Sequence, residues 1–305
     1  MNGRIYIIPS NKLDKIRWDN CIYDAANALV YATSTYLDTM ATHWDAMILN
    51  DYEYVMPLPW RKKYFISYIY PPAFTQQLGI FSAKKITEKE TALFIKAIPA
   101  KYKYCEISFN YGNHVNGNSA TASKNYLLSL GPEYEALHDA YSRSAIRNIT
   151  KANNAGIIVR ENIDPADIIQ MHRERFGDNI GANSNDYENF IALSRAMLQK
   201  KQCFTIGAYN TKQTLFAGSI YFLYKNRLTF ILNGNTQESL HWGATHLLKD
   251  YTIKKFAGTR LILDFEGSDF ESFARFYQQF GAKEIEYYQT VILNRLPFFI
   301  KFLKR

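Results

Sequence analysis

The chain has 305 residues, of which 47% are hydrophobic and 21% are charged, a composition that indicates a globular protein long enough for two domains. The net charge of +8 favours anionic partners, but it is spread evenly, with 14 basic against 10 acidic residues in 1–130 and 22 against 18 in 131–305. This even distribution excludes a dedicated basic arm for nucleic acid.

Two series of predicted elements follow each other in the same order. The first comprises strands over 44–50, 54–60 and 64–70, a helix over 87–98 and a strand over 104–109. The second comprises strands over 204–210, 215–224 and 227–233, a helix over 243–256 and a strand over 260–265. The offset of roughly 160 residues indicates a duplicated domain rather than a solenoid.

A helix-rich stretch separates the two series. Residues 134–154 place Tyr141, Ala145, Ile149 and Ala152 on one face, and the run NNAG ends this predicted helix. A strand over 157–161 follows, and Asp164-Pro165 then starts a further helix, with the carboxylate as N-cap and the proline at the first helical position. Another helix is predicted over 187–200.

The interdomain helix also carries Arg143, Arg147 and Lys151 at i, i+4 and i+8. This spacing places the three cations on one face, opposite the apolar one. They are suited to a phosphate-bearing ligand, and a solvated basic face is the alternative.

The two halves diverge after their last predicted strand. In the second half, LDFEGSDFESFARFYQQFGA reads as a strand that ends at Asp264–Phe265, a polar turn and a helix over 270–280 closed by Gly281. In the first half, a polar loop over 110–123 takes the place of this helix. Spacing alone puts Tyr277 in an aromatic stripe that packs on the core.

Cysteine and histidine positions give no metal-binding pattern. Cys21, Cys105 and Cys203 are far apart, which favours buried free thiols in a reducing cytosol. His241 and His246 are five residues apart, not the four that would put two ligands on one helix face. We therefore expect no metal.

The hydropathy pattern favours a protein without a membrane anchor. The N-terminus lacks the apolar core of a signal peptide, and no apolar run approaches the ~20 residues that span a bilayer. The apolar residues 296–300 could touch a membrane, although a docked terminal strand or helix is our interpretation. We expect a cytoplasmic protein with no stable membrane insertion.

The segment ARFYQQFGA resembles the helix-to-strand signature of the GNAT N-acyltransferases, in which a glycine follows a tyrosine by four residues and a strand comes next, here over 285–293. The whole chain is similar to tandem-GNAT proteins, which include the Fem-type peptidoglycan-bridge aminoacyltransferases and related bacterial acetyltransferases. SAIRNITKA followed by Gly156 resembles their basic interdomain helix, and DFEGS followed by FYQQFGA resembles their C-terminal signature.

This resemblance implies an α/β (α+β) fold of two tandem GNAT-like domains with mixed, mostly antiparallel sheets flanked by helices. The expected division is a degenerate N-terminal domain over 1–133, a basic interdomain helix over 134–156 and a C-terminal domain over 157–305.

The resemblance also implies site residues. Tyr277 matches the general acid that protonates the coenzyme A thiolate, and Glu266 is a candidate base for the incoming amine, with a solvated turn residue as the alternative. GNAT enzymes hold the acyl-CoA pyrophosphate at a Gln/Arg-x-x-Gly-x-Gly/Ala turn before a helix. Residues 240–245 keep Gly243 in this turn but lack the leading Gln or Arg and carry a bulky Trp242.

The predicted residues fall into three groups. The predicted catalytic residues are Tyr277 and Glu266. The predicted acyl-CoA contacts are Asn233, Gly243, Ala244, Thr245 and Ser268. The predicted substrate contacts are Asn235, Arg143, Arg147 and Lys151. A turn is the alternative interpretation of Asn233–Asn235.

The resemblance implies transfer of an acyl group from acyl-CoA, or a similar activated donor, to an amine. Backbone N–H groups at a splayed strand pair would stabilise the oxyanion. One alternative is aminoacyl transfer from aminoacyl-tRNA to a peptidoglycan precursor. Another is a catalytically silent binding protein, which the altered turn at 240–245 favours.

Overall fold

A computed structural model describes residues 4–115, 120–177, 181–267 and 270–297. Contacts divide the chain into two units, the first formed by 1–123 with 287–305 and the second by 124–286. This grouping assigns the last strand of the chain, from Tyr287 onward, to the first unit, unlike the division at 133 and 156 expected from the sequence. Each unit is described by itself.

The first unit is an α/β structure whose strands lie in the spatial order β1-β2-β3-β4-β5-β12. Its strands are β1 (Ile5–Pro9), β2 (His43–Leu49), β3 (Tyr54–Lys63), β4 (Ile66–Ile69), β5 (Tyr102–Phe109) and β12 (Lys283–Asn294). Its helices are α1 (Lys15–Asp24), α2 (Ser34–Met40) and α3 (Glu88–Ala97), with short 3₁₀ turns η1 (Ser10–Lys12) and η2 (Val30–Ala32). Strands β4 and β5 run parallel, and the other pairs are antiparallel.

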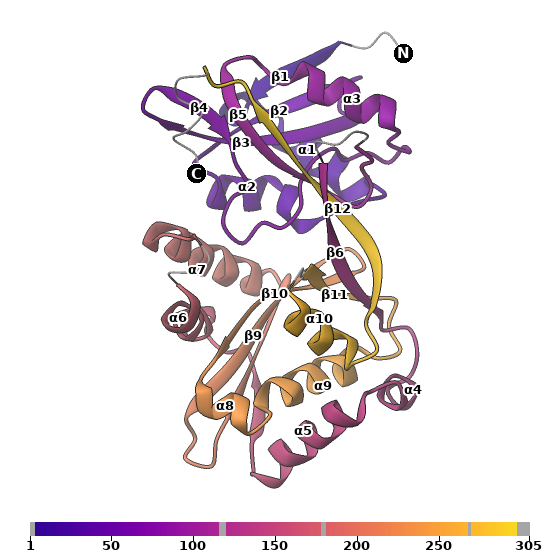
Figure 1. The fold of residues 1–305 in the computed structure, drawn as a ribbon, viewed down its shortest axis with the longest axis vertical. Helices are drawn as coiled ribbons and strands as arrows, with labels where there is room; N and C mark the ends of the chain where they lie inside the picture. The colour runs from indigo at the N-terminus through magenta and orange to yellow at the C-terminus, as the bar shows by residue number, and fades with distance from the viewer. Residues whose placement is uncertain (1–3, 116–119, 178–180, 268–269, 298–305) are drawn as a thin grey trace. The chain divides into compact units, whose positions relative to one another are not determined.

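The second unit repeats this plan in the order β6-β11-β10-β9-β8-β7 (Figure 1). Its strands are β6 (Ala120–Ser129), β7 (Ile158–Glu161), β8 (Cys203–Tyr209), β9 (Leu215–Tyr224), β10 (Arg227–Asn235) and β11 (Ile262–Gly267). Its helices are α4 (Tyr134–Asp139), α5 (Arg143–Asn154), α6 (Pro165–Phe176), α7 (Ser184–Gln199), α8 (Gln237–His241), α9 (Ala244–Phe256) and α10 (Glu271–Gln278). Here β10 and β11 form the parallel pair.

The element orders of the two units match, which confirms the predicted duplication. Strand, two helices, three antiparallel strands, helix and parallel strand recur from β1 to β5 and from β7 to β11, with α8 as an addition before α9. The last strand of each series is exchanged between the two. Strand β6 follows β5 in the chain but pairs with β11, whereas β12 follows β11 but pairs with β5.

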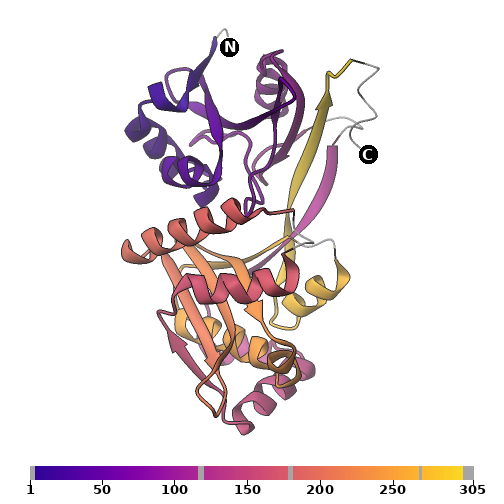
Figure 2. The same cartoon turned by 90° about the vertical axis from the view of Figure 1, so that its left-hand side faces the viewer.

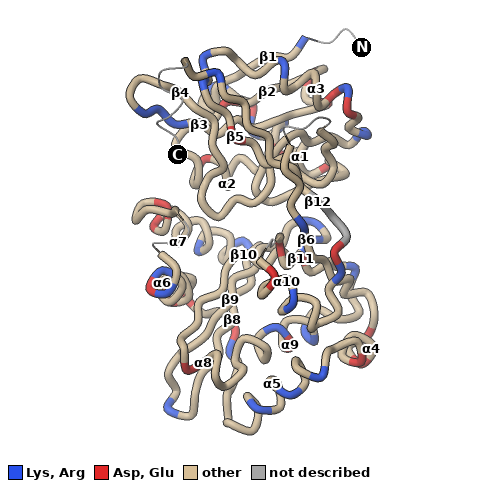
Figure 3. Tube along the Cα trace, in the orientation of Figure 1, with Lys and Arg blue, Asp and Glu red and all other residues tan. Residues whose placement is uncertain are grey.

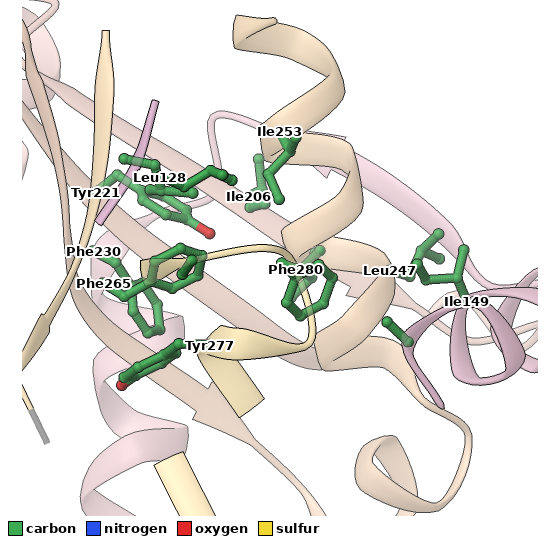
Figure 4. Packing of buried hydrophobic residues seen from close by; sticks show 14 of the residues in the cluster. Leu128, Ile149, Ile206, Tyr221, Phe230, Leu247, Ile253, Phe265, Tyr277 and Phe280 are labelled. Carbon is green, nitrogen blue, oxygen red and sulfur yellow. The ribbon is translucent and has the colours of Figure 1, made fainter. Parts of the chain in front are cut away.

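Helices cover both faces of the second sheet. Helices α6 and α7 lie on one face and α9 lies on the other, with α5 packed against α9 (Figures 1 and 2). The core between α9 and the sheet contains Leu128, Tyr221, Phe230, Phe265 and Phe280 (Figure 4). Burial of these large apolar side chains stabilises the unit.

Three local predictions need correction. The single helix expected over 134–154 is two helices, because the chain breaks after Asp139 and the Ser142 side chain caps a new helix at the Ala145 N–H. The segment Asn233–Asn235 is strand rather than turn, since it pairs with 217–219 of β9. The loop expected over 110–123 gives way to β6 at Ala120.

In the first unit, a segment of the same chain around Leu78 fills the space beside the end of β5. Leu78 donates its N–H to the Ser108 carbonyl and accepts from the Asn110 N–H, so the segment around Leu78 pairs with β5. The pocket that remains at this place has a volume of about 10 Å³, which is room for about one water molecule. The equivalent region of the second unit is open.

Candidate functional site

The second unit contains a strand splay. Strands β10 and β11 pair over Arg227–Thr229 and Ile262–Asp264, and their pairing within the described residues ends there. A pocket of about 420 Å³, which we call the splay pocket, lies where the strands part. It is lined by His172, Phe176, Phe230, Ile231, Leu232, Asn233, Asn235, Phe265, Glu266, Gly267, Phe270, Phe273 and Tyr277.

A second pocket of about 270 Å³ adjoins it and shares Phe176, Phe230, Asn233, Asn235, Phe273 and Tyr277 with it. We call it the helix-end pocket, because Gly243 and Thr245 at the start of α9 line it together with Arg175, Leu240, His246, Ser272 and Phe276. The two pockets are of the size that small-molecule sites have.

Asp264 fixes the backbone where the strands part. Its carboxylate pairs with Arg227 at 2.6 Å and accepts from the Asn125 side chain and the Glu266 N–H. Both charged side chains are almost fully buried. Glu266 has a φ of +62°, an unusual value for a residue with a side chain, so the Asp264 contact holds a turned backbone at this point.

This turn places the Glu266 carboxyl in the splay pocket. Its Oε1 is buried and has no hydrogen-bond partner within the described residues. Burial raises the pKa of Glu266 well above its ordinary 4.5. A polar group of this kind costs free energy unless it meets a partner, which makes it a candidate contact for a ligand.

Tyr277 forms another wall of the splay pocket. Its ring packs on Phe265, with centroids 4.9 Å apart, and on Tyr126, with centroids 5.9 Å apart. Figure 4 shows its hydroxyl pointing away from the other labelled core residues. Burial, aided by the charges of Glu266 and Asp264, raises the pKa of Tyr277, so the phenol stays protonated at neutral pH. Tyr277 therefore packs on the core, as its spacing predicted, and also lines the splay pocket.

His172 faces the same pocket from α6. Its Nδ1 lies 2.9 Å from the Asn233 carbonyl oxygen, which can only accept, so Nδ1 carries the proton and Nε2 has the lone pair. Nε2 is buried and has no partner within the described residues. Burial lowers the pKa of His172 below 6.5, which keeps the ring neutral near pH 7.

Two glycines allow α6 to lie close enough for this contact. A Cβ at Gly234 would stand 2.3 Å from the Ile168 carbonyl oxygen, and one at Gly218 would stand 2.6 Å from the Ile168 side chain. Both distances are shorter than van der Waals contact. The absence of side chains at these strand positions is therefore what brings His172 onto Asn233.

The start of α9 shapes the helix-end pocket. Gly243 has a φ of +74°, and within the described part of the chain no side-chain cap is formed at this helix start, which favours an anion at the first N–H groups of α9. The Thr245 hydroxyl is buried without a partner within the described residues. Packing also requires a glycine at position 243, because a Cβ there would lie 2.5 Å from the Asn148 carbonyl oxygen.

Arg175 supplies a positive charge on the opposite side of the helix-end pocket. It lies on α6, one turn after His172, and donates a hydrogen bond to the Asn235 side chain. Asn233 is likewise held, since its Oδ1 accepts from the Ser219 hydroxyl at 3.0 Å. Both predicted asparagines therefore line the pockets as fixed parts of their walls.

The basic helix lies elsewhere in the second unit. Arg147 and Lys151 line a separate groove with Trp242, and the Lys151 ammonium donates to the His241 carbonyl at 2.6 Å. Arg143 is exposed on the same helix, and Figure 3 shows the row of blue along α5. Neither pocket at the splay includes these cations.

The predicted site residues thus divide by location. The structure brings together Tyr277, Glu266, Asn233, Asn235, Gly243 and Thr245 around the two pockets. Ala244 is fully buried at the start of α9 and lines neither pocket. Ser268 lies outside the described residues. No observation tests the roles of these residues, which stay predictions.

Sequence reasoning missed His172, Arg175 and Asp264. The carbonyl that orients His172 is 61 positions away, so spacing within α6 gives no signal. Gly234, next to Asn233 in β10, is the sequence signal for this contact, because a glycine inside a strand often marks a close approach by another element.

The geometry defines a class. Each unit has a meander of strands, a helix and a parallel strand, and the second has a splay at its parallel pair. The chain has the tandem GNAT fold, related to that of Fem-type proteins. No family model matches the sequence, and no curated protein matches it either.

Solved structures share this fold across nearly the whole chain. FemX is 9% identical with a TM-score of 0.62, and the match covers 93% of this chain and 97% of FemX. A tandem GNAT protein from the clavulanic acid biosynthesis pathway is 10% identical with a TM-score of 0.57, covering 96% and 99% of the two chains. The C-terminal domain of a putative lysylphosphatidylglycerol synthetase from Agrobacterium fabrum is 11% identical with a TM-score of 0.54, covering 93% and 92%.

Two features are absent from the described residues. These residues contain no group of three or more His, Cys, Asp or Glu side chains placed to hold a metal ion. In the same part of the chain, no helix is both long and apolar enough to cross a membrane.

Proposed function

We propose that the protein transfers an acyl group from an activated, phosphate-bearing donor to an amine, with the reaction in the splay pocket of the second unit. The observation that carries this proposal is the pocket itself, which has three titratable side chains in an otherwise mostly apolar wall. The fold supports the reaction class, because FemX and the clavulanic acid pathway protein share it.

The donor's phosphate would bind in the helix-end pocket. The first N–H groups of α9 and the Arg175 guanidinium both favour an anion there. The reactive carbonyl would extend into the splay, where backbone N–H groups of the unpaired strand ends stabilise the oxyanion. The phosphate of acyl-CoA and that of aminoacyl-tRNA both satisfy this chemistry.

The amine must lose two protons when it enters as an ammonium and leaves as an amide. In our proposal Glu266 takes the first, because a bound ammonium supplies the positive charge that favours its carboxylate. His172 takes the second at Nε2 after the nitrogen attacks the carbonyl. Tyr277 gives its proton to the leaving group, and the net proton released goes to solvent.

A ligand titration separates the donor classes. We expect coenzyme A and acetyl-coenzyme A, or alternatively charged tRNA, to raise the melting temperature of the purified protein by mass action. At a ligand concentration about one hundred times Kd, binding adds about 2.7 kcal/mol to the free energy of unfolding. A shift with coenzyme A alone selects the acyl-CoA donor. A salt-sensitive shift with tRNA alone selects Fem-type transfer.

Arg175→Ala is the matched variant for this titration. It should weaken binding of either donor, whereas Arg195→Ala on α7, whose partner is Asp164 outside both pockets, should leave it unchanged. If none of the ligands shifts the melting temperature, the proposal fails and the silent binding protein becomes the better account.

A further inference from the structure

The hairpin between β3 and β4 in the first unit has an unusual tip. Lys63 pairs with Ile66, so the turn consists of only Tyr64 and Phe65. Their φ values are +47° and +66°, the left-handed conformation of a type I′ turn, for which Asn-Gly is strongly preferred. Two large aromatic residues here are strained, and strain of this kind is retained where it has a function.

Both aromatic side chains project into solvent. Tyr64 is 80% exposed and Phe65 is 92% exposed, the two highest values among the large hydrophobic residues of the described chain. Packing within the unit therefore gives no reason for their presence. Because the two rings are adjacent on one tip, they form a single apolar patch that is open to a partner.

The surroundings of the tip are positively charged. Lys62 and Lys63 are exposed beside it, and Lys103 is exposed after Tyr102, which pairs with Ser67 of β4. Figure 3 shows blue along the hairpin near the labels β3 and β4. The sequence from 54 to 87 contains five lysine and arginine residues and no acidic residue. This positive charge favours an anionic partner.

The lysines also affect what the rings can do. The Lys62 ammonium lies 5.6 Å from the Phe65 ring centroid, and the Lys63 ammonium lies 5.6 Å from that of Tyr64. Each ring thus has a cation over its face, which competes with the base stacking that single-stranded nucleic acid requires. Aromatic rings flanked by lysine stems instead match the headgroup region of a bilayer, where the rings enter and the ammonium groups remain among phosphates.

We propose that the Tyr64–Phe65 tip is a peripheral membrane contact that binds the surface of an anionic lipid bilayer. The rings supply apolar area, and Lys62 and Lys63 supply attraction to the headgroups. The contact is reversible, since one tip of two side chains buries little surface. This inference is independent of the chemistry proposed for the second unit.

The test is flotation of the full chain with phosphatidylcholine vesicles, prepared with and without phosphatidylglycerol. We expect binding only to the anionic vesicles and its loss at high salt. The double variant Tyr64→Asn with Phe65→Gly should reduce the partition coefficient on the order of tenfold or more. Because Asn-Gly suits a type I′ turn, this variant keeps or raises the melting temperature, which separates lost binding from lost folding.

Two further variants complete the design. Lys62→Gln with Lys63→Gln should weaken anionic binding by about 25-fold, at roughly fivefold for each lysine. Ile16→Ser removes an exposed hydrophobic side chain from α1 and should bind as the wild type does. Equal binding of wild type and the Asn-Gly variant would overturn the proposal. So would tip-dependent binding of bulk tRNA without any binding to vesicles.

Discussion

His172 shows how one hydrogen bond sets the chemistry of a side chain. The Asn233 carbonyl fixes the tautomer, and burial keeps the ring neutral with a free Nε2 lone pair. Glu266 and Tyr277, in the same pocket, are both shifted toward their protonated forms. The empty pocket therefore contains one proton acceptor that is ready at neutral pH, beside Tyr277, which holds its proton. Glu266 becomes an acceptor when a bound ammonium favours its carboxylate, and this division suits acid–base work.

The pH dependence of transfer should report this acceptor. Since burial lowers the pKa of His172, the neutral ring persists below pH 6.5, so the acidic limb that His172 contributes to kcat/KM should lie below that value. His172→Gln should lower kcat by about 10²- to 10⁴-fold and remove this limb while leaving donor affinity unchanged. Rate profiles of both proteins provide the measurement. An unaltered acidic limb in the variant would take His172 out of the mechanism.

At the scale of elements, the contact between α6 and β10 positions the site. Gly234 lets the helix lie against the strand, and this proximity puts His172 and Arg175 at the two pockets. The same feature explains how the backbone carbonyl of a strand residue 61 positions away orients the imidazole ring of His172.

Gly234→Ala tests this packing. The new methyl group would overlap the Ile168 carbonyl, so we expect a loss of about 1 to 3 kcal/mol of stability and reduced activity as α6 moves outward. Denaturant unfolding gives the stability. Gly131→Ala is the matched control, because a Cβ there would have ordinary contacts at 3.5 Å or more. A Gly234→Ala protein as stable and active as the control would show that α6 is not held in this way.

Periodicity and cap residues predicted much of the architecture. The alternating runs in 203–235 gave three strands close to their observed bounds, and Asp164-Pro165 starts α6 as expected, with the Asp164 side chain accepting from the Ala166 N–H. These are local signals, and the structure retains them. The break at 140–142 was missed because the apolar period runs straight through it, although Ser142 is an acceptable cap.

The candidate site was less predictable because it depends on contacts between distant segments. Tyr277 and Glu266 were singled out through a resemblance, and the structure places both in one pocket. His172 and Asp264 derive their importance from partners on other elements, Asn233 in one case and Arg227 in the other. No pattern within a single helix or strand encodes such a pair.

The two duplicated units differ in the space beside their parallel strand pairs, β4–β5 in the first and β10–β11 in the second. In the first, Leu78 pairs with β5 and leaves about 10 Å³ of space. In the second, the strands part and leave pockets of about 270 and 420 Å³. We therefore propose donor binding in the second unit alone and, in the first unit, a membrane contact at the β3–β4 tip.

Hydrogen exchange with and without the donor that raises the melting temperature tests the central claim most directly. We expect slower exchange in 230–235, 244–247 and 265–267, the segments around the splay and the start of α9, and no change in 66–81 or 102–109. Protection confined to the second unit supports a single donor site at the β10–β11 splay. Protection of the first unit instead, or donor binding that leaves the β10 and β11 ends unprotected, would contradict it.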